Sequence, residues 1–396
     1  MKEIRIVENR LPEEWWESVF TEARAREVRK FHGSFPEYGP TPLGNLKELA
    51  EKLGVAGIYV KDESKRFGLN AFKALGGSFA IANVLREKLR LDEDEMTFQK
   101  LTSPEIQEKT REMTFVTATD GNHGRGVAWT ASRLGAKSVV YMPKGSAAER
   151  LENIRRAGAH SEITEWNYDD TVRFAKKQAE ENGWTLVQDT AWEGYRRIPR
   201  WIMEGYLTMA DEAAEQLKGT APTHIFLQAG VGSMAGAVAA YFSDRYREAP
   251  PRIIVVEPHG ADCLFRTAKA ADGELHPVTG DMNSICAGLC CGEPCDIAWE
   301  LLRDHAEFFA SIPDEVAAMG MRILGNPLGK DPRIVSGESG AAGLGLAAAL
   351  LTDPSLAEQK ALLGLDENAR ILCFSTEGDT DRANYRRIVW EGKYSY

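Results

Sequence analysis

Residues 114–142 read TFVTATDGNHGRGVAWTASRLGAKSVVYM. Two short segments, 114–118 and 138–142, have the length and β-branched composition of buried strands, and a helical pattern at 123–134 separates them. Strands that alternate with helices pair in parallel and are covered by helices on both faces. This stretch therefore predicts an α/β fold with parallel, helix-covered sheets.

The same alternation extends in both directions along the chain. Further strands are expected at 57–61, 185–187, 225–227, 253–256 and 371–374. Further helices are expected at 72–89, 147–156, 169–181 and after Gly232. The polar and aromatic segment before Tyr38 is expected to be an arm or a subunit contact. With 396 residues, the chain is too long for one compact core, so two domains are expected.

Charge and hydropathy argue against several classes of partner. The 48 basic and 59 acidic residues give a formal net charge of −11, whereas nucleic-acid binders need a basic surface. The N-terminus, Met1–Arg5, lacks the apolar run of a signal peptide. Glycines break the apolar stretch Gly340–Leu351, which is too short to cross a bilayer. We therefore expect a cytoplasmic protein that binds neither nucleic acid nor a membrane.

Four of the six cysteines, Cys286, Cys290, Cys291 and Cys295, are close together in the sequence. No CxxC pair occurs among them, although such pairs are typical of structural metal sites. We therefore expect reduced thiols and no metal. Whether Cys263 pairs with a cysteine of this group stays open on the sequence alone.

The glycine loop Gly230–Gly236 follows a predicted strand and opens a predicted helix. Backbone N–H groups of such a turn can close around a phosphate at the helix N-terminus. A tight turn without a ligand is the alternative interpretation of the same glycines. Glu257, at the end of the next strand, even matches the ribose-binding acid of a dinucleotide site. The loop thus indicates a phosphate site without identifying the ligand.

Lys73 stands at the start of a predicted helix between Phe72 and Ala74, which is a poor setting for a solvated charge. Most lysines are surface residues, and that is the simpler interpretation. A lysine in a dry pocket, however, is more readily deprotonated and becomes a nucleophile for carbonyl groups. Lys73 is therefore a candidate for covalent chemistry.

Three more segments follow predicted strands. The amides of the turn 119–124 can bind a carboxylate, although Asp120 as a helix cap and His123 as a packing residue are simpler interpretations. In 375–380, a hydroxyl can bond to a heterocycle nitrogen or belong to an ordinary turn, and Asp189 ends another strand. Ligands bind at the carboxyl ends of strands in open α/β sheets, so these segments can meet in one cleft.

Together, these segments resemble the fold-type II pyridoxal-phosphate (PLP) enzymes, the group of tryptophan synthase β, cysteine synthase and threonine dehydratase. The resemblance implies that Lys73 holds PLP as a Schiff base and that Asn122 lies against its phenolic oxygen. It implies that Thr376, in preference to Ser375, meets the pyridine nitrogen. The phosphate would be bound by Gly230, Val231, Gly232, Ser233 and Met234.

A closer resemblance is to the diaminopropionate ammonia-lyases, and it extends over nearly all of residues 38–393. The segments that carry it are KDESKRFGLNAFK (61–73), TDGNHGRG (119–126), DTAWEGY (189–195), SGESG (336–340) and STEGDTD (375–381). Long blocks of this kind are far more specific than a short glycine pattern.

This resemblance implies α,β-elimination from D- and L-2,3-diaminopropionate, a small amino acid, to give pyruvate and two ammonia. Lys73 would be the base for the L form and Asp120 for the D form. Asp189 would hold the distal amine or tune Asp120. The residues that would bind the substrate carboxylate are Thr119, Gly121 and His123.

Three alternatives stay open on the sequence. A serine or threonine dehydratase shares every cofactor motif, but such enzymes have a small uncharged residue where this chain has Asp120. A nicotinamide-dependent dehydrogenase would use the glycine loop and Glu257, but it leaves Lys73 unexplained. A noncatalytic PLP carrier would bind the cofactor without turnover.

The resemblance also implies an organisation of the chain. Residues 1–78 and 196–396 would form a large cofactor-binding domain, and residues 79–195 a smaller, mobile domain that carries the substrate-carboxylate loop. Enzymes of this fold group usually form homodimers, so the resemblance implies a homodimer.

Overall fold

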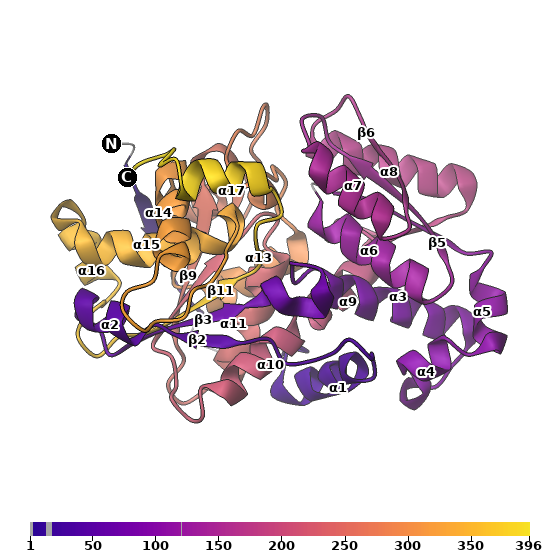
Figure 1. The fold of residues 1–396 in the computed structure, drawn as a ribbon, viewed down its shortest axis with the longest axis horizontal. Helices are drawn as coiled ribbons and strands as arrows, with labels where there is room; N and C mark the ends of the chain where they lie inside the picture. The colour runs from indigo at the N-terminus through magenta and orange to yellow at the C-terminus, as the bar shows by residue number, and fades with distance from the viewer. Residues whose placement is uncertain (1–2, 13–17, 120) are drawn as a thin grey trace.

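The computed structural model describes residues 3–12, 18–119 and 121–396, which contain two β-sheets (Figure 1). The seven-stranded sheet has the order β1 (Arg5–Glu8), β10 (Phe308–Ile312), β9 (Arg252–Pro258), β8 (His224–Gln228), β11 (Arg370–Ser375), β3 (Gly57–Asp62) and β2 (Leu43–Asn45). The four-stranded sheet has the order β6 (His160–Ile163), β5 (Lys137–Met142), β4 (Thr114–Ala118) and β7 (Thr185–Leu186). All neighbours pair in parallel except the edge strands β1 and β2. The predicted α/β class is therefore confirmed.

Helices surround both sheets. The longer ones are α1 (Glu22–Gly33), α3 (Ala74–Leu89), α6 (Asn122–Arg133), α7 (Ala148–Arg156), α8 (Tyr168–Asn182), α9 (Arg197–Gly205), α10 (Leu207–Gln216), α11 (Ser233–Arg245), α12 (Cys263–Ala270), α13 (Asp296–His305), α14 (Asp314–Gly325), α15 (Glu338–Thr352) and α17 (Arg382–Val389). The shorter ones are α2 (Lys47–Leu53), α4 (Phe98–Leu101), α5 (Pro104–Thr110) and α16 (Ala357–Leu362). Figure 1 shows α6, α7 and α8 around the four-stranded sheet at one end of the molecule, with α14 to α17 at the other.

Each sheet draws its strands from one part of the chain. Strands β4 to β7 lie within residues 79–195 and form the four-stranded sheet, whereas the other described strands form the seven-stranded sheet. This arrangement agrees with two domains. The division at residues 78 and 195 stays a prediction.

Strand β11 contributes side chains to two hydrophobic cores, one on each face of the larger sheet. Leu372 and Phe374 belong to the core on one face of the larger sheet, and Ile371 and Cys373 belong to the core on the other. Side chains alternate along a strand, so Ser375 shares the face of Ile371 and Cys373. This alternation decides which hydroxyl at the end of β11 can reach a ligand.

The described residues of the N-terminal segment pack against the rest of the chain. Strand β1 pairs antiparallel with β10, and α1 contacts α10. In α1, Ala25, Val28 and Phe31 recur at helical spacing and are buried. The expectation of an arm was wrong for the described part of this segment, because its apolar face is covered by the rest of the chain. The alternative, a subunit contact, stays a prediction.

Helix α3 contacts both α6 and α9 and so links the surroundings of the two sheets. The contacts are close because glycines replace side chains where the helices cross. A Cβ atom on Gly126 would lie 2.9 Å from the Ala74 nitrogen, and one on Gly205 would lie 2.4 Å from the Leu75 carbonyl oxygen. The first turn of α3, which follows Lys73, is therefore held from two sides.

Helix α15 accounts for the most apolar stretch of the sequence. Its side chains from Glu338 to Leu350 are all buried within the protein. Among the described residues, no single helix is long and apolar enough to cross a bilayer. One pair, Glu338–Thr352 with Pro354–Leu362, reaches that length and composition only together, and it bends by 93° at the break.

Candidate active site

A cavity of about 630 Å³ is lined by the segments that follow β4, β7, β8 and β11, so it receives residues from both sheets. This is the edge where open α/β sheets bind ligands. The predicted site residues that line it are Lys73, Thr119, Asn122, His123, Asp189, Gly230, Val231, Gly232, Ser233, Met234 and Thr376. Gly121 and Ser375 lie outside the lining, and Asp120 lies outside the described residues.

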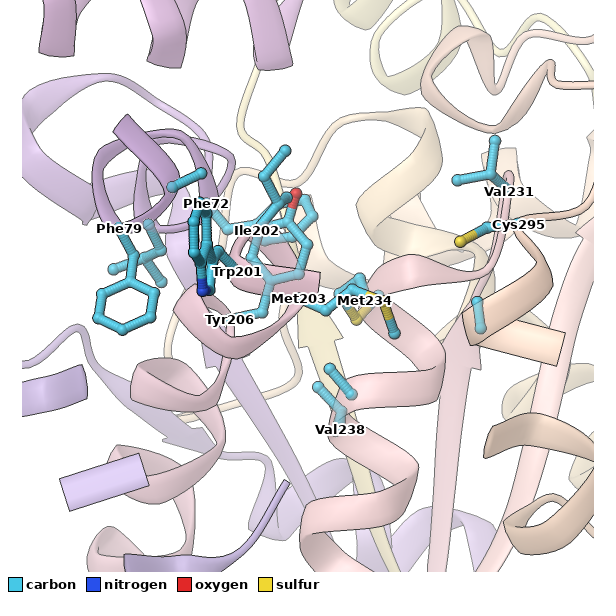
Figure 2. Close-up of a cluster of buried hydrophobic side chains, with 14 of the residues drawn as sticks. Phe72, Phe79, Trp201, Ile202, Met203, Tyr206, Val231, Met234, Val238 and Cys295 are labelled. Carbon is cyan, nitrogen blue, oxygen red and sulfur yellow. The ribbon is translucent and has the colours of Figure 1, made fainter. Parts of the chain in front are cut away.

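Lys73 lies against an apolar wall, part of which Figure 2 shows. Its Nζ atom is 5.4 Å from the ring centre of Phe72 and 6.0 Å from that of Tyr206. These two rings are 4.7 Å apart and belong to the same buried cluster as Met203 and Met234. The Lys73 side chain is 19% exposed, so its amine reaches the cavity from a largely dry surface.

Asp189 is the ion-pair partner of Lys73, with 2.5 Å between Oδ2 and Nζ. Its other oxygen accepts hydrogen bonds from the Tyr168 hydroxyl at 3.2 Å and from Gln188 Nε2 at 3.3 Å. Burial by itself raises the pKa of the Asp189 carboxyl, but the Lys73 ammonium outweighs burial and holds that pKa well below its usual range. Asp189 is therefore a carboxylate at neutral pH.

His123 is buried and neutral. Its Nε2 atom lies 2.8 Å from the Val187 carbonyl oxygen, so this nitrogen carries the proton and donates it. Burial is the main cause that lowers the pKa of His123. Its Nδ1 atom, 3.9 Å from Asp189 Oδ2, has no hydrogen-bond partner among the described residues and holds a lone pair. The imidazole therefore cannot donate to a substrate carboxylate through Nδ1.

The turn before α6 presents a helix N-terminus to the cavity. The Gly121 amide donates to Thr119 Oγ1 at 2.9 Å and is thus engaged inside the turn. Gly121 has φ of 150°, and a Cβ there would lie 3.0 Å from Arg150 Cδ, so this position requires glycine. Helix α6 begins directly after it at Asn122, which lines the cavity with His123. Carboxylate binding at this turn would depend on backbone N–H groups of the first turn of α6.

The glycine loop connects β8 to α11. Gly232 has φ of 99°, a conformation that favours glycine, and α11 begins at Ser233. The Ser233 hydroxyl donates to the Asp189 carbonyl oxygen at 2.6 Å, which ties the loop to the segment after β7. A Cβ on Gly230 would lie 3.2 Å from Cys291 Sγ. The loop therefore brings the N-terminus of a long helix to the cavity wall, as a phosphate site needs.

The two hydroxyls at the end of β11 point in different directions. Thr376 lines the cavity, and its Oγ1 accepts a hydrogen bond from Gln228 Nε2 at 2.9 Å. That bond leaves the Thr376 hydroxyl hydrogen for a ligand. Ser375 is fully buried, and its Oγ donates to Ser336 Oγ at 2.8 Å on the opposite face of the strand. The geometry favours Thr376 over Ser375 as the partner of a ring nitrogen.

Two cavity residues were missed by the sequence reasoning. Glu338 and Glu377 both line the cavity and are almost completely buried, and Glu377 Oε2 accepts a hydrogen bond from Asn122 Nδ2 at 2.5 Å. Both stand in segments that carry the family resemblance. An acidic residue at a glycine turn after an apolar strand was the signal that could have found Glu377.

Glu257 does not serve a dinucleotide site. It is fully buried, and its two oxygens accept hydrogen bonds from the Leu264 and Phe265 amides at 2.9 and 2.6 Å. The carboxylate thus caps the first turn of α12 and does not line the cavity. The alternative of a nicotinamide-dependent dehydrogenase therefore lacks the acidic residue that would bind the ribose.

The six cysteines are free thiols. Cys290 and Cys291 line the cavity, and Cys263 is buried with Sγ 3.8 Å from the Cys291 carbonyl oxygen. In the described part of the chain, no three His, Cys, Asp or Glu side chains are grouped so that they could hold a metal ion.

Comparison with known proteins agrees with this geometry. The family described as "Pyridoxal-phosphate dependent enzyme" matches residues 35–366. The diaminopropionate ammonia-lyase of Escherichia coli K12 is 53% identical over 379 residues, which are 95% of this chain and 94% of that protein. The enzyme of the same name from Salmonella typhimurium LT2 is 53% identical over 371 residues, 93% of this chain and 92% of that protein.

Solved structures give the same result. The E. coli diaminopropionate ammonia-lyase in complex with an aminoacrylate-PLP azomethine reaction intermediate superposes with a TM-score of 0.92, at 50% identity, over 99% of this chain and 98% of that one. The same enzyme in complex with D-serine gives 0.91 at 49% identity with the same coverage. A tomato threonine deaminase, at 18% identity and a TM-score of 0.73 over 97% of this chain and 91% of that one, shares the fold.

The chain belongs to the PLP-dependent enzymes of fold type II, and its cavity contains the lysine, the helix N-terminus and the hydroxyl that this cofactor requires. Within that class, it belongs to the family of the diaminopropionate ammonia-lyases. PLP is therefore its cofactor, and the family expected from the sequence is confirmed.

Proposed function

We propose that this protein is a PLP-dependent lyase that converts 2,3-diaminopropionate and water to pyruvate and two ammonia. The α,β-elimination would release the first ammonia, and hydrolysis of the remaining enamine by water would release the second. The observation that carries the proposal is the amine of Lys73, which reaches the cavity beside Asp189 in a chain 53% identical to a diaminopropionate ammonia-lyase. Bound PLP would draw electrons from the substrate Cα and so make its proton removable. Binding, orientation and proton transfer depend on residues of this chain.

The cavity offers a partner for each polar end of PLP. Lys73 would hold its aldehyde carbon covalently. The glycine loop and the N-terminus of α11 would hold the phosphate. Thr376 would meet the ring nitrogen and Asn122 the phenolic oxygen, since both side chains line the cavity and carry a hydrogen to donate.

Proton transfer would be divided between two bases. Lys73, once released by the substrate amine, would take the Cα proton of the L form, and Asp120 that of the D form from the opposite face. Asp189 is a carboxylate next to Lys73, so it can hold the distal ammonium of the substrate or tune Asp120. The distal nitrogen leaves as ammonia only while protonated, so an acid or an ordered water must keep it charged.

The substrate carboxylate would bind at the turn that contains Thr119, Gly121 and His123. A helix N-terminus attracts an anion through its N–H groups and its dipole. The first turn of α6 meets this requirement, since Asn122 and His123 line the cavity there.

A second candidate reaction is the elimination of water from serine. One observation favours it, namely that the E. coli relative was solved with D-serine. Serine carries a neutral hydroxyl in place of the distal ammonium of diaminopropionate. The carboxylate of Asp189 therefore favours diaminopropionate by charge.

The deciding experiment is pyruvate release by the purified holoenzyme from D- and L-diaminopropionate and from D- and L-serine. We expect a higher kcat/KM for both diaminopropionate isomers than for either serine. Turnover of serine alone would replace the proposed substrate. Bound PLP without turnover of any of the four would favour the noncatalytic carrier.

We further propose that the protein is a cytoplasmic homodimer of two-domain subunits. The homodimer is supported by the dimers common in this fold group, and the two domains by the origin of each sheet from one part of the chain. The net charge of −11 agrees with a cytoplasmic protein. Light scattering should then give twice the 43.8 kDa of one chain. Proteolysis near residue 195, between β7 and α9, tests the second boundary, since residue 78 lies inside α3 and is buried.

A further inference from the structure

Glu377 connects the two halves of the cavity. Its Oε2 atom accepts a hydrogen bond from Asn122 Nδ2 at 2.5 Å, at the start of α6. Its Oε1 atom accepts one from the Ser339 amide at 3.3 Å, at the start of α15. The residue is 1% exposed. Both carboxylate oxygens are therefore engaged, one on each side of the cavity.

The backbone around Glu377 is fixed next to the lysine segment. The Phe72 amide donates to the Thr376 carbonyl oxygen at 3.0 Å, and Ala71 and Glu377 form an antiparallel bridge. The Gly337 amide donates to the Glu377 carbonyl oxygen at 2.9 Å, and a Cβ on Gly337 would lie 2.9 Å from Glu377 Cγ. The carboxylate thus has a defined position relative to both Lys73 and Asn122.

An asparagine amide can face a ligand with its oxygen or with its NH₂ group. A carboxylate accepts hydrogen bonds only, so Glu377 requires the NH₂ group of Asn122 on its side. One hydrogen of Nδ2 points to Glu377, and the second is left for an acceptor in the cavity. Without the carboxylate, nothing in these contacts would select this orientation over its flipped form.

We propose that Glu377 is a positioning residue for the cofactor: by binding one hydrogen of Asn122 Nδ2, it aims the other at the phenolic oxygen of PLP. This inference rests on the proposed role of Asn122. It assigns Glu377 to cofactor binding and to the electronic state of the ring, and not to proton transfer with the substrate. The identity of the substrate does not enter it.

The first test is Glu377→Gln. An amide has one acceptor oxygen, so the variant cannot accept from both Ser339 and Asn122. We expect the Kd for PLP, measured by titrating the apoprotein, to rise about tenfold, as for the loss of one charge-assisted hydrogen bond. We also expect the visible absorption band of the bound cofactor to shift, because the phenolic oxygen loses an oriented donor.

The matched control is Glu212→Gln. Glu212 is a buried carboxylate that does not line the cavity, and its oxygens accept hydrogen bonds from Lys61 and Arg66. We expect the Kd for PLP per folded molecule to stay within about twofold of the wild-type value and the absorption band to stay unshifted. Equal changes in Glu212→Gln and Glu377→Gln would overturn the proposal, since a general loss of buried negative charge would then explain both.

The second test is the pair Asn122→Ala and Asn122→Ala/Glu377→Gln. If Glu377 acts through Asn122, the double variant has the same Kd and the same band as Asn122→Ala. Changes in Kd and band that add up in the double variant would overturn the positioning role of Glu377 alone. The same holds if Glu377→Gln has wild-type values while Asn122→Ala does not. Normal binding and a normal band in Asn122→Ala would remove the proposed role of Asn122 and this inference with it.

If Glu377→Gln does not fold, Glu377→Asp provides the same readouts. Its shorter carboxylate keeps the charge but cannot span from the Ser339 amide to Asn122 Nδ2. We expect a weaker PLP affinity and a shifted band here too, and wild-type values for both would contradict the proposal.

Discussion

Lys61 and Lys73 stand in the same block of sequence, and each forms an ion pair with a carboxylate, yet their surroundings differ. Lys61 Nζ donates to Glu212 Oε2 at 2.7 Å, to the Thr41 carbonyl oxygen at 2.7 Å and to Gln216 Oε1 at 2.8 Å, and its side chain is fully buried. Lys73 pairs with Asp189 at 2.5 Å and lines a cavity with 19% of its side chain exposed.

The difference shows that burial and pairing do not by themselves create a reactive amine. Burial lowers the pKa of Lys61, although Glu212 and Glu63 oppose that shift. An ammonium has three hydrogens, and at Lys61 each has an acceptor in the protein. Lys61 therefore has no approach for a ligand, whereas Lys73 combines a dry wall with an open side.

The largest effect is expected for Lys73→Ala. We expect the variant to lose covalent attachment of PLP and to lose turnover by at least about 10⁴-fold, because in our proposal Lys73 is both the attachment point and a base. Borohydride reduction followed by mass spectrometry locates the attachment, and a pyruvate assay gives the rate. If borohydride still attached PLP to the variant at the wild-type level, on Lys61 or on another residue, the difference drawn between Lys61 and Lys73 would be contradicted.

The next effect is expected for Glu212→Gln, on stability and not on chemistry. Glu212 also accepts from Arg66 Nη1 at 2.9 Å and from Arg66 Nη2 at 2.8 Å, so the variant removes the anion that two buried cations share, although Arg66 keeps Glu63. Breaking a buried ion pair in this way costs about 3–5 kcal/mol of unfolding free energy. Urea denaturation measures the loss, and turnover per folded molecule should stay near wild type. A large loss of turnover in a stable variant would instead place Glu212 in the reaction.

A smaller and more selective effect is expected for Asp120→Asn. Because Lys73 serves one face of the substrate in our proposal, the D isomer needs the second base. We expect turnover of D-diaminopropionate to fall about 10²-fold and that of the L isomer by less than about tenfold. Rates for the two isomers, measured side by side, check the prediction. Equal losses would reject two separate bases.

Much of the fold could be predicted from the sequence because its central strands are long and apolar. Strands β4, β8, β9 and β11 lie within two residues of the expected segments. The edge strands β1 and β2 contain only 4 and 3 residues, which is too short for a period of two to be visible. Their pairing depends on partners far away in the sequence, which local patterns do not reveal.

In the site, too, residues with a local sequence pattern were predicted, and contacts between residues far apart in the sequence were not. Lys73 and the glycine loop were found because their flanking residues carry the signal. The bond between Asn122 and Glu377 joins residues 255 positions apart, and no local pattern indicates it. The choice of Thr376 over Ser375 was given by resemblance, although alternation along β11 supplies a physical reason.

The smallest effect is expected on stability at Glu338, a buried carboxyl whose surroundings differ from those of Glu212. Burial raises the pKa of Glu212, but Arg66 and then Lys61 outweigh it and hold that pKa below its usual value. Glu338 has an amide, Asn384, at one oxygen and a second carboxyl, Glu377, nearby. Burial and then Glu377 raise the pKa of Glu338 from 4.5 to about 7. Ionised Glu212 therefore stabilises the fold, whereas ionised Glu338 destabilises it.

The pH dependence follows from these signs. A carboxyl whose folded pKa is raised contributes stability below its unfolded value of 4.5, and this contribution is lost as the pH rises to about 7. Glu338→Gln keeps the acceptor for Asn384 and cannot ionise, so we expect it to raise the unfolding free energy by about 1–3 kcal/mol at pH 8. At pH 4.5 the gain should vanish, since Glu338 is then protonated in the folded protein. Urea denaturation at both pH values measures the difference. An equal gain at both would contradict the raised pKa of Glu338, and a loss at pH 8 would show that ionised Glu338 is stabilised by a partner, as Glu212 is.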